Sequence, residues 1–100
     1  MNTGTNQAKI DFFFFFLVEN YLKVLSNPDR LKILCVLVEG ELNVQKIEES
    51  TDIHQPTLSQ QLTVLRKNNM VSTRREGKQI FYQVSDPRIL TIMQTLHQLY

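Results

Sequence analysis

Apolar residues recur every three or four positions in several stretches of this chain, which is the spacing of amphipathic helices. The predicted helices span residues 9–25, 28–38, 44–50, 56–68 and 87–100. Residues 1–8 are polar and lack this periodicity, so we expect a disordered start. Residues 9–100 are then long enough for a single domain with one modest core.

Residues at the edges of these stretches mark where helices begin. Asn27 is expected to cap the second helix and Pro28 to occupy its first position, because proline fits there without losing a hydrogen bond. Pro56 and the pair Asp86 and Pro87 mark two further starts. Helical spacing then assigns two inward faces: Leu31, Leu34, Cys35 and Val38 in the second helix, and Leu58, Leu62 and Leu65 in the fourth.

Two short stretches with the composition of strands, residues 71–75 and 79–84, flank Glu76, Gly77 and Lys78. Such a pair around a glycine-containing turn predicts a β-hairpin. Helix, helix, helix, turn, helix, hairpin, helix is the element order of a winged helix-turn-helix. The predicted fold class is therefore mainly α with a small β-hairpin.

Apolar residues on the first and last helices exceed what one small core can bury. Five consecutive phenylalanines, Phe12 to Phe16, point to every side of the first helix, because successive residues are about 100° apart. Either two or three of them pack on the core, or a second subunit wraps the helix; large apolar patches favour the second interpretation. The predicted dimer interface comprises Phe13, Phe16, Leu17, Ile92, Leu96, Leu99 and Tyr100.

Charge is distributed unevenly, although the net charge is only +1. Residues 1–50 carry 5 basic and 7 acidic side chains, a balance of −2, so residues 51–100 carry +3. Most of this excess lies in residues 66–78, where the Lys and Arg side chains face only Glu76. A local basic stripe of this kind suits a phosphate backbone.

Residues 44–68 have the layout of a helix-turn-helix, whose second helix enters the major groove of DNA. Its outward positions carry amides and hydroxyls, which donate to and accept from base edges, whereas an ordinary solvated face usually carries Glu and Lys. The cations of the hairpin are close enough together to reach a phosphate or the minor groove. The predicted DNA-binding residues are Gln55, Thr57, Ser59, Gln60, Thr63, Arg74, Arg75 and Lys78.

Two longer segments also carry a family resemblance. NPDRLKILCVLVEGELNV and QPTLSQQLTVLRKNNMVSTRREGKQIFYQV resemble the ArsR/SmtB family of dimeric winged-helix repressors, and most of all its BigR-like and HlyU-like members. The resemblance extends over residues 20–100. It implies a homodimer held together by the first and last helices and bound to an inverted-repeat operator in double-stranded DNA.

Many members of this family bind a metal, and the resemblance identifies where the ligands would lie. The cysteine-containing motif of one family site falls on residues 41–45, which hold no cysteine. The other family site begins with an Asp-x-His pair; here Asp86 is present, but Arg88 occupies the position of the His and Leu99 the position of a later His. Zinc needs about three or four converging ligands. We therefore expect no metal and no other cofactor.

Cys35 is the single cysteine, so no internal disulfide can form and a reducing cytoplasm fits best. Its chemistry alone favours a small buried hydrophobe. The resemblance indicates a sensor instead, because BigR-like proteins carry a cysteine here that pairs with a second one in the last helix when oxidised or persulfidated, which loosens DNA binding. That second cysteine would fall just after Tyr100. The candidate effector is reactive sulfur or an oxidant, acting on such a pair or on an unpaired thiol.

Other functions are weaker candidates. No Ser/His/Asp or Cys/His set, Gly-rich phosphate loop or carboxylate pair supports an enzyme. The apolar run from Phe12 to Val18 is too short to span a bilayer, and no signal-peptide cleavage pattern follows it. A winged-helix module for protein contacts alone and an anti-repressor of the HlyU type stay open beside the repressor.

Overall fold

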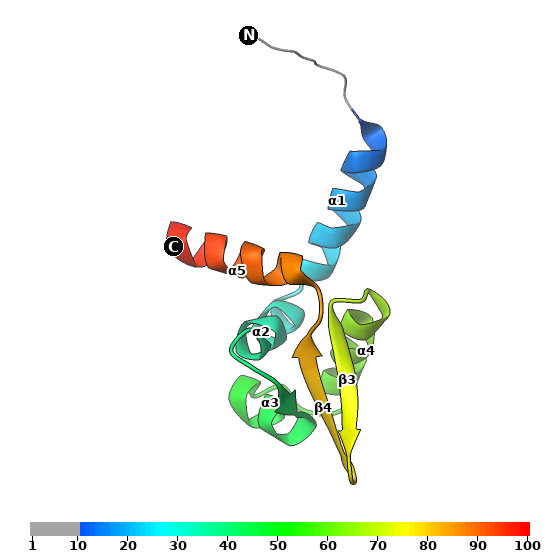
Figure 1. Cartoon of the computed structure of the whole chain (residues 1–100), viewed down its shortest axis with the longest axis vertical. Helices are drawn as coiled ribbons and strands as arrows, with labels where there is room; N and C mark the ends of the chain where they lie inside the picture. The colour runs from blue at the N-terminus through cyan, green and yellow to red at the C-terminus, as the bar shows by residue number, and fades with distance from the viewer. Residues whose placement is uncertain (1–10) are drawn as a thin grey trace.

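The computed structural model describes residues 11–100, so the expected disordered start and the first two positions of the first helix lie outside the described residues. Over this range the chain forms five helices and one small sheet (Figure 1). The helices are α1 (Phe12–Leu25), α2 (Pro28–Leu37), α3 (Val44–Thr51), α4 (Thr57–Lys67) and α5 (Pro87–Leu99). The strands are β2 (Leu42–Asn43), β3 (Val71–Glu76) and β4 (Gln79–Val84). This order confirms the predicted winged helix-turn-helix.

Side-chain caps fix where four of the helices begin. The amide oxygen of the predicted cap Asn27 accepts a hydrogen bond from a backbone N–H three residues further on, at 3.0 Å. Asp86 caps α5, and in both helices a proline occupies the first position as predicted. Asp11 and Asn43 cap α1 and α3, which pattern alone did not identify. These bonds satisfy N–H groups that a helix leaves unpaired at its start.

The core lies where α2, α3, α4 and the sheet meet. The side chains of α4 that were assigned to the interior are all buried there, which confirms that stripe: Leu58, Leu62 and Leu65. Buried partners come from α3 with Ile47, from the start of β3 with Val71, and from α5 with Ile89. Most of the apolar stabilisation of the protomer therefore comes from the helix-turn-helix and its immediate supports.

The predicted inward face of α2 is confirmed at Leu34 and wrong at its other three positions. Cys35 is exposed, and Leu31 and Val38 are only half-buried. The buried side chains of α2 are Ile33, Leu34 and Leu37, of which Leu34 alone belonged to the predicted face. Because α2 packs against α1, α3, α4 and β4 together, the direction of those four neighbours selects its buried face, and that direction differs by part of a helical turn from the predicted one.

The sheet is antiparallel, with strand order β2-β4-β3. The hairpin of β3 and β4 confirms the prediction, with Glu76 opposite Gln79 across a two-residue turn. Gly77 is the first turn residue and has a φ of +63°, which glycine adopts without steric cost. Strand β2 was not predicted, because two residues are too few to show an alternating pattern.

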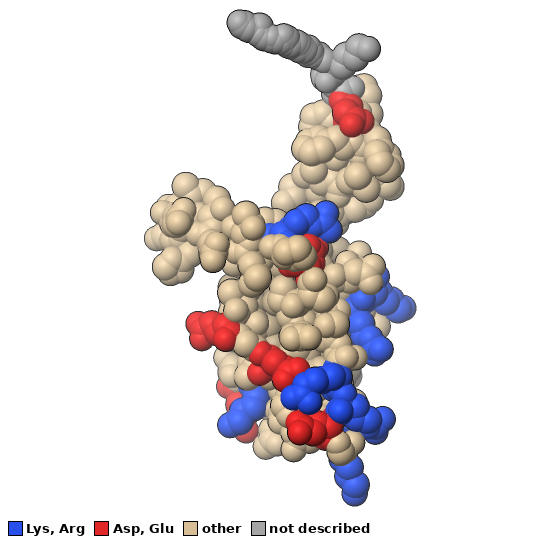
Figure 2. All heavy atoms as spheres, in the orientation of Figure 1, with Lys and Arg blue, Asp and Glu red and all other residues tan. Residues whose placement is uncertain are grey.

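Helices α1 and α5 extend from the body in different directions and leave an open V between them (Figure 1). Their outer surfaces carry large apolar side chains that the protomer leaves exposed: Phe12, Phe13, Phe14, Phe15, Phe16, Leu17, Leu22, Leu90, Leu96, Leu99 and Tyr100. Figure 2 shows this part of the molecule as largely uncharged, while basic side chains gather toward the wing. No helix within residues 11–100 combines the length and the hydropathy needed to cross a membrane.

Candidate nucleic-acid interface

The turn between α3 and α4 is held by hydrogen bonds around one buried threonine. The Thr51 hydroxyl donates to the Ile47 carbonyl at 2.7 Å and accepts from the Ile53 N–H at 3.3 Å. The Lys32 ammonium donates to the Thr51 carbonyl at 2.9 Å, which ties the end of α3 to α2. Asp52 then turns the chain with a φ of 59°. These bonds fix the direction in which α4 leaves α3.

Helix α4 rests on its buried leucines and presents a polar face to solvent. Ser59, Gln60 and Thr63 are exposed on that face, whereas Thr57 is half-buried. Among the hydrogen bonds formed within residues 11–100, none uses the Gln60 amide, so both its donor and its acceptor are available. The helix carries no carboxylate and ends with Arg66 and Lys67 in its last turn. This composition suits contact with a polyanion.

Three of the predicted DNA-binding residues form side-chain hydrogen bonds that support the helix itself. The Gln55 side-chain oxygen accepts from the Ser59 N–H at 3.1 Å and from the Ser59 hydroxyl at 2.6 Å. Pro56 provides no side-chain cap for α4, so Gln55 performs this task from one residue further back. The Thr63 hydroxyl donates to the Ser59 carbonyl at 2.8 Å. Of the predicted readers on α4, Thr57 and Gln60 form no side-chain hydrogen bond within residues 11–100, and Gln60 is the exposed one of the two.

Arg74 lies on the wing, but its guanidinium is paired at the base of the sheet. It forms a bidentate pair with Glu41, with Nε–Oε2 and Nη2–Oε1 distances of 2.7 and 2.8 Å. It also contacts Glu76 at 3.3 Å and lies 4.6 Å from the ring centroid of Phe81. Arg74 holds the pKa of the Glu41 carboxyl below its ordinary value. The structure therefore separates Arg74 from the other two wing cations that the sequence grouped with it.

Arg75 and Lys78 are the wing cations that form no ion pair within residues 11–100. Both side chains are exposed, and Arg75 donates only to the Gly77 carbonyl, at 3.2 Å, in the hydrogen bonds within residues 11–100. Their positive charge is not neutralised by a paired carboxylate in this part of the chain. Figure 2 shows basic side chains at this end of the molecule, where the wing lies. The wing thus offers two side chains for phosphate contacts.

His54 lies in the turn before α4 between two carboxylates. Its Nδ1 is 2.8 Å from a Glu48 oxygen and its Nε2 is 2.8 Å from an Asp52 oxygen. These hydrogen bonds, that from Glu48 foremost, raise the pKa of the His54 imidazole above its ordinary value. A protonated His54 ties the end of α3 to the turn.

The raised pKa of His54 predicts a pH-dependent contribution to stability. The folded protein binds this proton more tightly than the unfolded chain, so the contribution is complete below about pH 6.5 and is lost as the pH rises through the folded pKa. We expect the wild-type melting temperature to exceed that of His54→Gln at about pH 5.5 and to match it at about pH 9. When Glu48→Gln protein replaces the wild type as the background, substituting His54 should lower the melting temperature at the acidic pH by a smaller amount. A difference in melting temperature between wild type and His54→Gln that does not change with pH contradicts the prediction.

Cys35 is exposed near the end of α2, so the expectation of a small buried hydrophobe is wrong. It lies between two clefts. One, of about 570 Å³, is bounded by the loop that holds Glu41; the other, of about 650 Å³, is bounded by α5 through Met93 and His97. Its thiol thus borders both the wing support and one of the two protruding helices.

Asp86 and Arg88, the positions at which the resemblance places metal ligands, form an ion pair at 2.9 Å. The Asp86 carboxylate also accepts from the Tyr21 hydroxyl at 2.9 Å. Within residues 11–100 no group of three or more His, Cys, Asp or Glu side chains is placed to hold a metal ion. Sequence reasoning missed both the Tyr21 contact and the Glu41 contact with Arg74, since their partners are 65 and 33 residues apart.

In sequence and in fold the chain is similar to bacterial transcriptional regulators. The model of the bacterial regulatory protein arsR family matches residues 27–73. The biofilm growth-associated repressor of Xylella fastidiosa is 47% identical over 83 residues, which cover 83% of this chain and 73% of the relative. The transcriptional activator HlyU of Vibrio cholerae is 38% identical over 79 residues, covering 79% and 73%. The crystal structure of the repressor BigR from Xylella fastidiosa aligns with a TM-score of 0.83 and 45% identity, covering 86% of this chain and 88% of that one.

Proposed function

Since this chain belongs to the arsR family of bacterial regulatory proteins and is a transcriptional regulator of that family, we propose that it is a dimeric, sequence-specific DNA-binding repressor. The observation that carries the proposal is the outer face of α4. Gln60 is exposed there with a side-chain amide that forms no hydrogen bond within residues 11–100, and the helix carries no carboxylate that would repel DNA. In the complex α4 lies in the major groove, and Gln60 pairs with a base edge while Ser59 and Thr63 contact bases or phosphates. The relatives found are regulators rather than enzymes, and a repressor acts in the cytoplasm, where the DNA is.

The wing supplies the sequence-independent part of the affinity. Arg75 and Lys78 contact the backbone phosphates beside the groove, where each contact releases a counterion. Arg74 instead keeps the wing attached to Glu41, so we assign it to the support of the wing rather than to a phosphate. Gln55 likewise caps α4, and this leaves its amide nitrogen free to contact DNA.

A second copy of the chain covers α1 and α5 in this proposal. The exposed apolar side chains on these helices include all the predicted interface residues except the half-buried Ile92. A protomer alone leaves this surface in water, at a cost of roughly 25 cal/mol for each Å² of apolar area. The dimer places its two α4 helices about 34 Å apart, so that they read the two halves of an inverted repeat.

Binding of the protein to the DNA upstream of its own gene tests the proposal. We expect tight binding that weakens steeply between about 50 and about 200 mM salt, because phosphate contacts release counterions. Binding that ignores salt, or no binding to any duplex, would leave only the winged-helix module for protein contacts. Sequence preference is read by competition with unrelated duplex DNA of the same length.

Release of the repressor is assigned to the thiol of Cys35. The thiolate attacks the terminal sulfur of a persulfide RSSH; a new S–S bond forms at Cys35, the bond between that sulfur and RS breaks, and RS⁻ leaves. The exposed thiol beside the cleft against α5 supports this assignment, because a larger group there meets the helix that forms the proposed interface. The signal thus reaches DNA through the arrangement of the two protomers.

Treating the DNA complex with a persulfide donor tests this step. We expect the wild-type protein to lose about tenfold or more in operator affinity after treatment, which is about 1.4 kcal/mol. Cys35→Ser should bind the operator as the untreated wild type does, with and without the donor. Equal binding by treated and untreated wild-type protein would keep the repressor and discard Cys35 as its sensor.

An anti-repressor is the second candidate, because one of the relatives is named a transcriptional activator. A repressor and an anti-repressor make opposite predictions for a reporter driven by the bound promoter. Deletion of the gene raises the reporter signal if the protein represses and lowers it if the protein displaces another repressor. A module that binds only protein has no affinity for the promoter, so deletion of its gene should leave the reporter signal unchanged.

A further inference from the structure

One carboxylate joins three elements at the base of the V between α1 and α5. Asp86 is nearly buried, at 7% exposure, and lies between the end of β4 and the start of α5. Its oxygens accept from the Tyr21 hydroxyl of α1 at 2.9 Å and from Arg88 Nε and Nη2 at 3.0 and 2.9 Å. The Arg88 backbone N–H adds a further bond at 3.0 Å.

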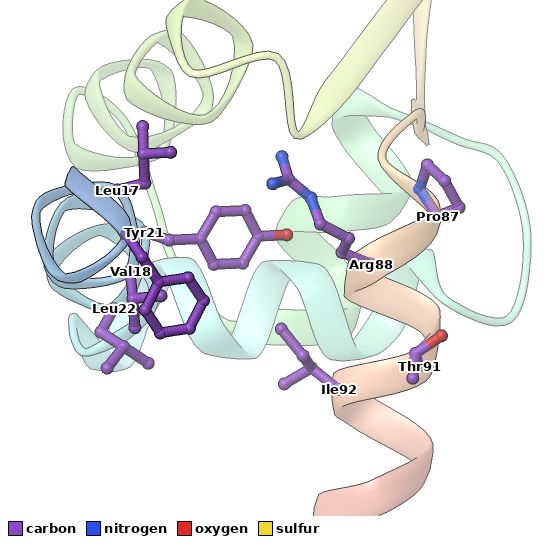
Figure 3. Close-up of a pocket in the computed structure, with 9 residues that line it drawn as sticks. Leu17, Val18, Tyr21, Leu22, Pro87, Arg88, Thr91 and Ile92 are labelled. Carbon is purple, nitrogen blue, oxygen red and sulfur yellow. The ribbon is translucent and has the colours of Figure 1, made fainter. Parts of the chain in front are cut away.

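Arg88 completes the junction from the side of α5. Its guanidinium carbon lies 4.6 Å from the centroid of the Tyr21 ring, so Arg88 contacts both the ring and the carboxylate that its hydroxyl reaches. Figure 3 shows Tyr21 and Arg88 extending toward each other from the two helices. Desolvation and the hydrogen bond to Asp86 raise the pKa of Tyr21 to about 12, so the hydroxyl remains a donor at neutral pH. Arg88 keeps the pKa of Asp86 low, so the carboxylate remains an acceptor.

The walls of the V above this junction are apolar. The cleft has a volume of about 580 Å³ and is lined on α1 by Leu17, Val18 and Leu22, and on α5 by Thr91 and Ile92 (Figure 3). Apolar contacts have no preferred direction, so they allow the two helices to change their angle at little cost. Hydrogen bonds and ion pairs are directional, and here they lie at the point where the two helices meet.

We propose that Asp86 is a positioning residue: by binding Tyr21 and Arg88 it fixes the angle between α1 and α5, and thereby the half-site spacing that the dimer accepts. The inference rests on the proposed function, since it assigns to α1 and α5 the interface between protomers. Helix α1 has 14 residues, so it is about 21 Å long. A tilt of about 10° at its base moves its tip by about 4 Å, close to the ~3.4 Å rise of one base pair. A small change at Asp86 is therefore enough to alter the register of one α4 against the other.

Two variants separate this role from a merely structural one. Tyr21→Phe removes the hydroxyl and keeps the ring under Arg88, and Asp86→Asn removes the charge and keeps a cap for α5. Affinity is measured for the operator and for versions with one base pair added or removed between the half-sites. We expect the wild type to bind the operator more tightly than the altered spacings. The ratio of these two affinities should be about tenfold smaller in both variants. Tyr82→Phe makes the same chemical change on β4 and should keep the wild-type ratio.

A purely structural effect would lower the melting temperature and weaken binding to all three DNAs alike, leaving the ratio unchanged, and that result would overturn the inference. The angle can also be measured without DNA. Spin labels at Asn20→Cys on α1 and Gln98→Cys on α5, in Cys35→Ser protein diluted with unlabelled chains, report the distance between the two helices. We expect a broader distribution in Tyr21→Phe; an unchanged width refutes the positioning role even if the chain binds no DNA. If the wild-type protein binds no DNA but the distance distribution is broader in Tyr21→Phe, the repressor is refuted and the control of the helix angle by Asp86 is not.

Discussion

Replacing Leu17 by Asp is expected to separate the dimer into folded protomers. Leu17 is 51% exposed in the protomer and lines the cleft between α1 and α5, so a carboxylate there remains in water when the protomer is alone. In the proposed dimer both copies of Leu17 are covered. Losing two buried leucines costs about 3 kcal/mol or more, and each buried, unpaired carboxylate adds to this. The dimer dissociation constant should therefore rise by at least about 100-fold, as measured by sedimentation equilibrium.

The matched control for this variant is Asn20→Asp. Asn20 is exposed on the same helix, but it does not line the cleft, so it introduces the same charge outside the proposed interface. Circular dichroism should show both variants folded, with Asn20→Asp dimeric and Leu17→Asp monomeric. Operator affinity should fall with the loss of the dimer, because one protomer reads only half of the inverted repeat. If Leu17→Asp dimerises as tightly as the wild type, the protomers meet through another surface.

The features that the sequence predicted best are those with local signals. Asn27 before Pro28, and Asp86 before Pro87, identify helix starts because the capping bond and the proline both act within one turn. The leucine stripe of α4 was correct because the other positions of the helix, Val64 excepted, are polar, so one face alone can be buried. The hairpin was correct because Gly77 supplies the positive φ of a tight turn.

Helix α2 shows where such signals end. It is apolar at nearly every position from Ile33 to Val38, so several faces fit the helical spacing equally well. The neighbours of the helix choose among them, and they expose Cys35 rather than bury it. The exposed position of the thiol, which makes Cys35 a candidate sensor, is a tertiary property that no spacing rule contains.

The predicted DNA-binding residues divide in the same way. The polar face of α4 is a local property, and Gln60 is exposed as a base-reading residue requires. The role of Arg74 depends on Glu41, which is 33 residues away in the sequence. Charge counting treats Arg74, Arg75 and Lys78 as equivalent, whereas the bidentate pair with Glu41 distinguishes the first from the other two.

Gln60→Ala is expected to reduce specific operator binding strongly. A bidentate base contact contributes about 1 to 3 kcal/mol of discrimination, and a dimer makes it in both half-sites, so the affinity should fall by about 30-fold or more. The amide makes no hydrogen bond within residues 11–100, so its removal leaves the helix and its stability unchanged. Binding to unrelated DNA should change little, because phosphate contacts remain. Fluorescence anisotropy with operator and unrelated duplexes measures both values.

Two comparisons make this result specific to α4. Gln98→Ala makes the same change at an exposed position of α5, and we expect this variant to bind the operator as the wild type does. Arg75→Ala should weaken binding to every duplex and reduce the slope of affinity against salt, because it removes a phosphate contact rather than a base contact. If Gln60→Ala lowers affinity for operator and unrelated DNA equally, Gln60 contacts the backbone. If it changes neither, α4 does not lie in the groove as proposed, because its most available reader would then touch no base.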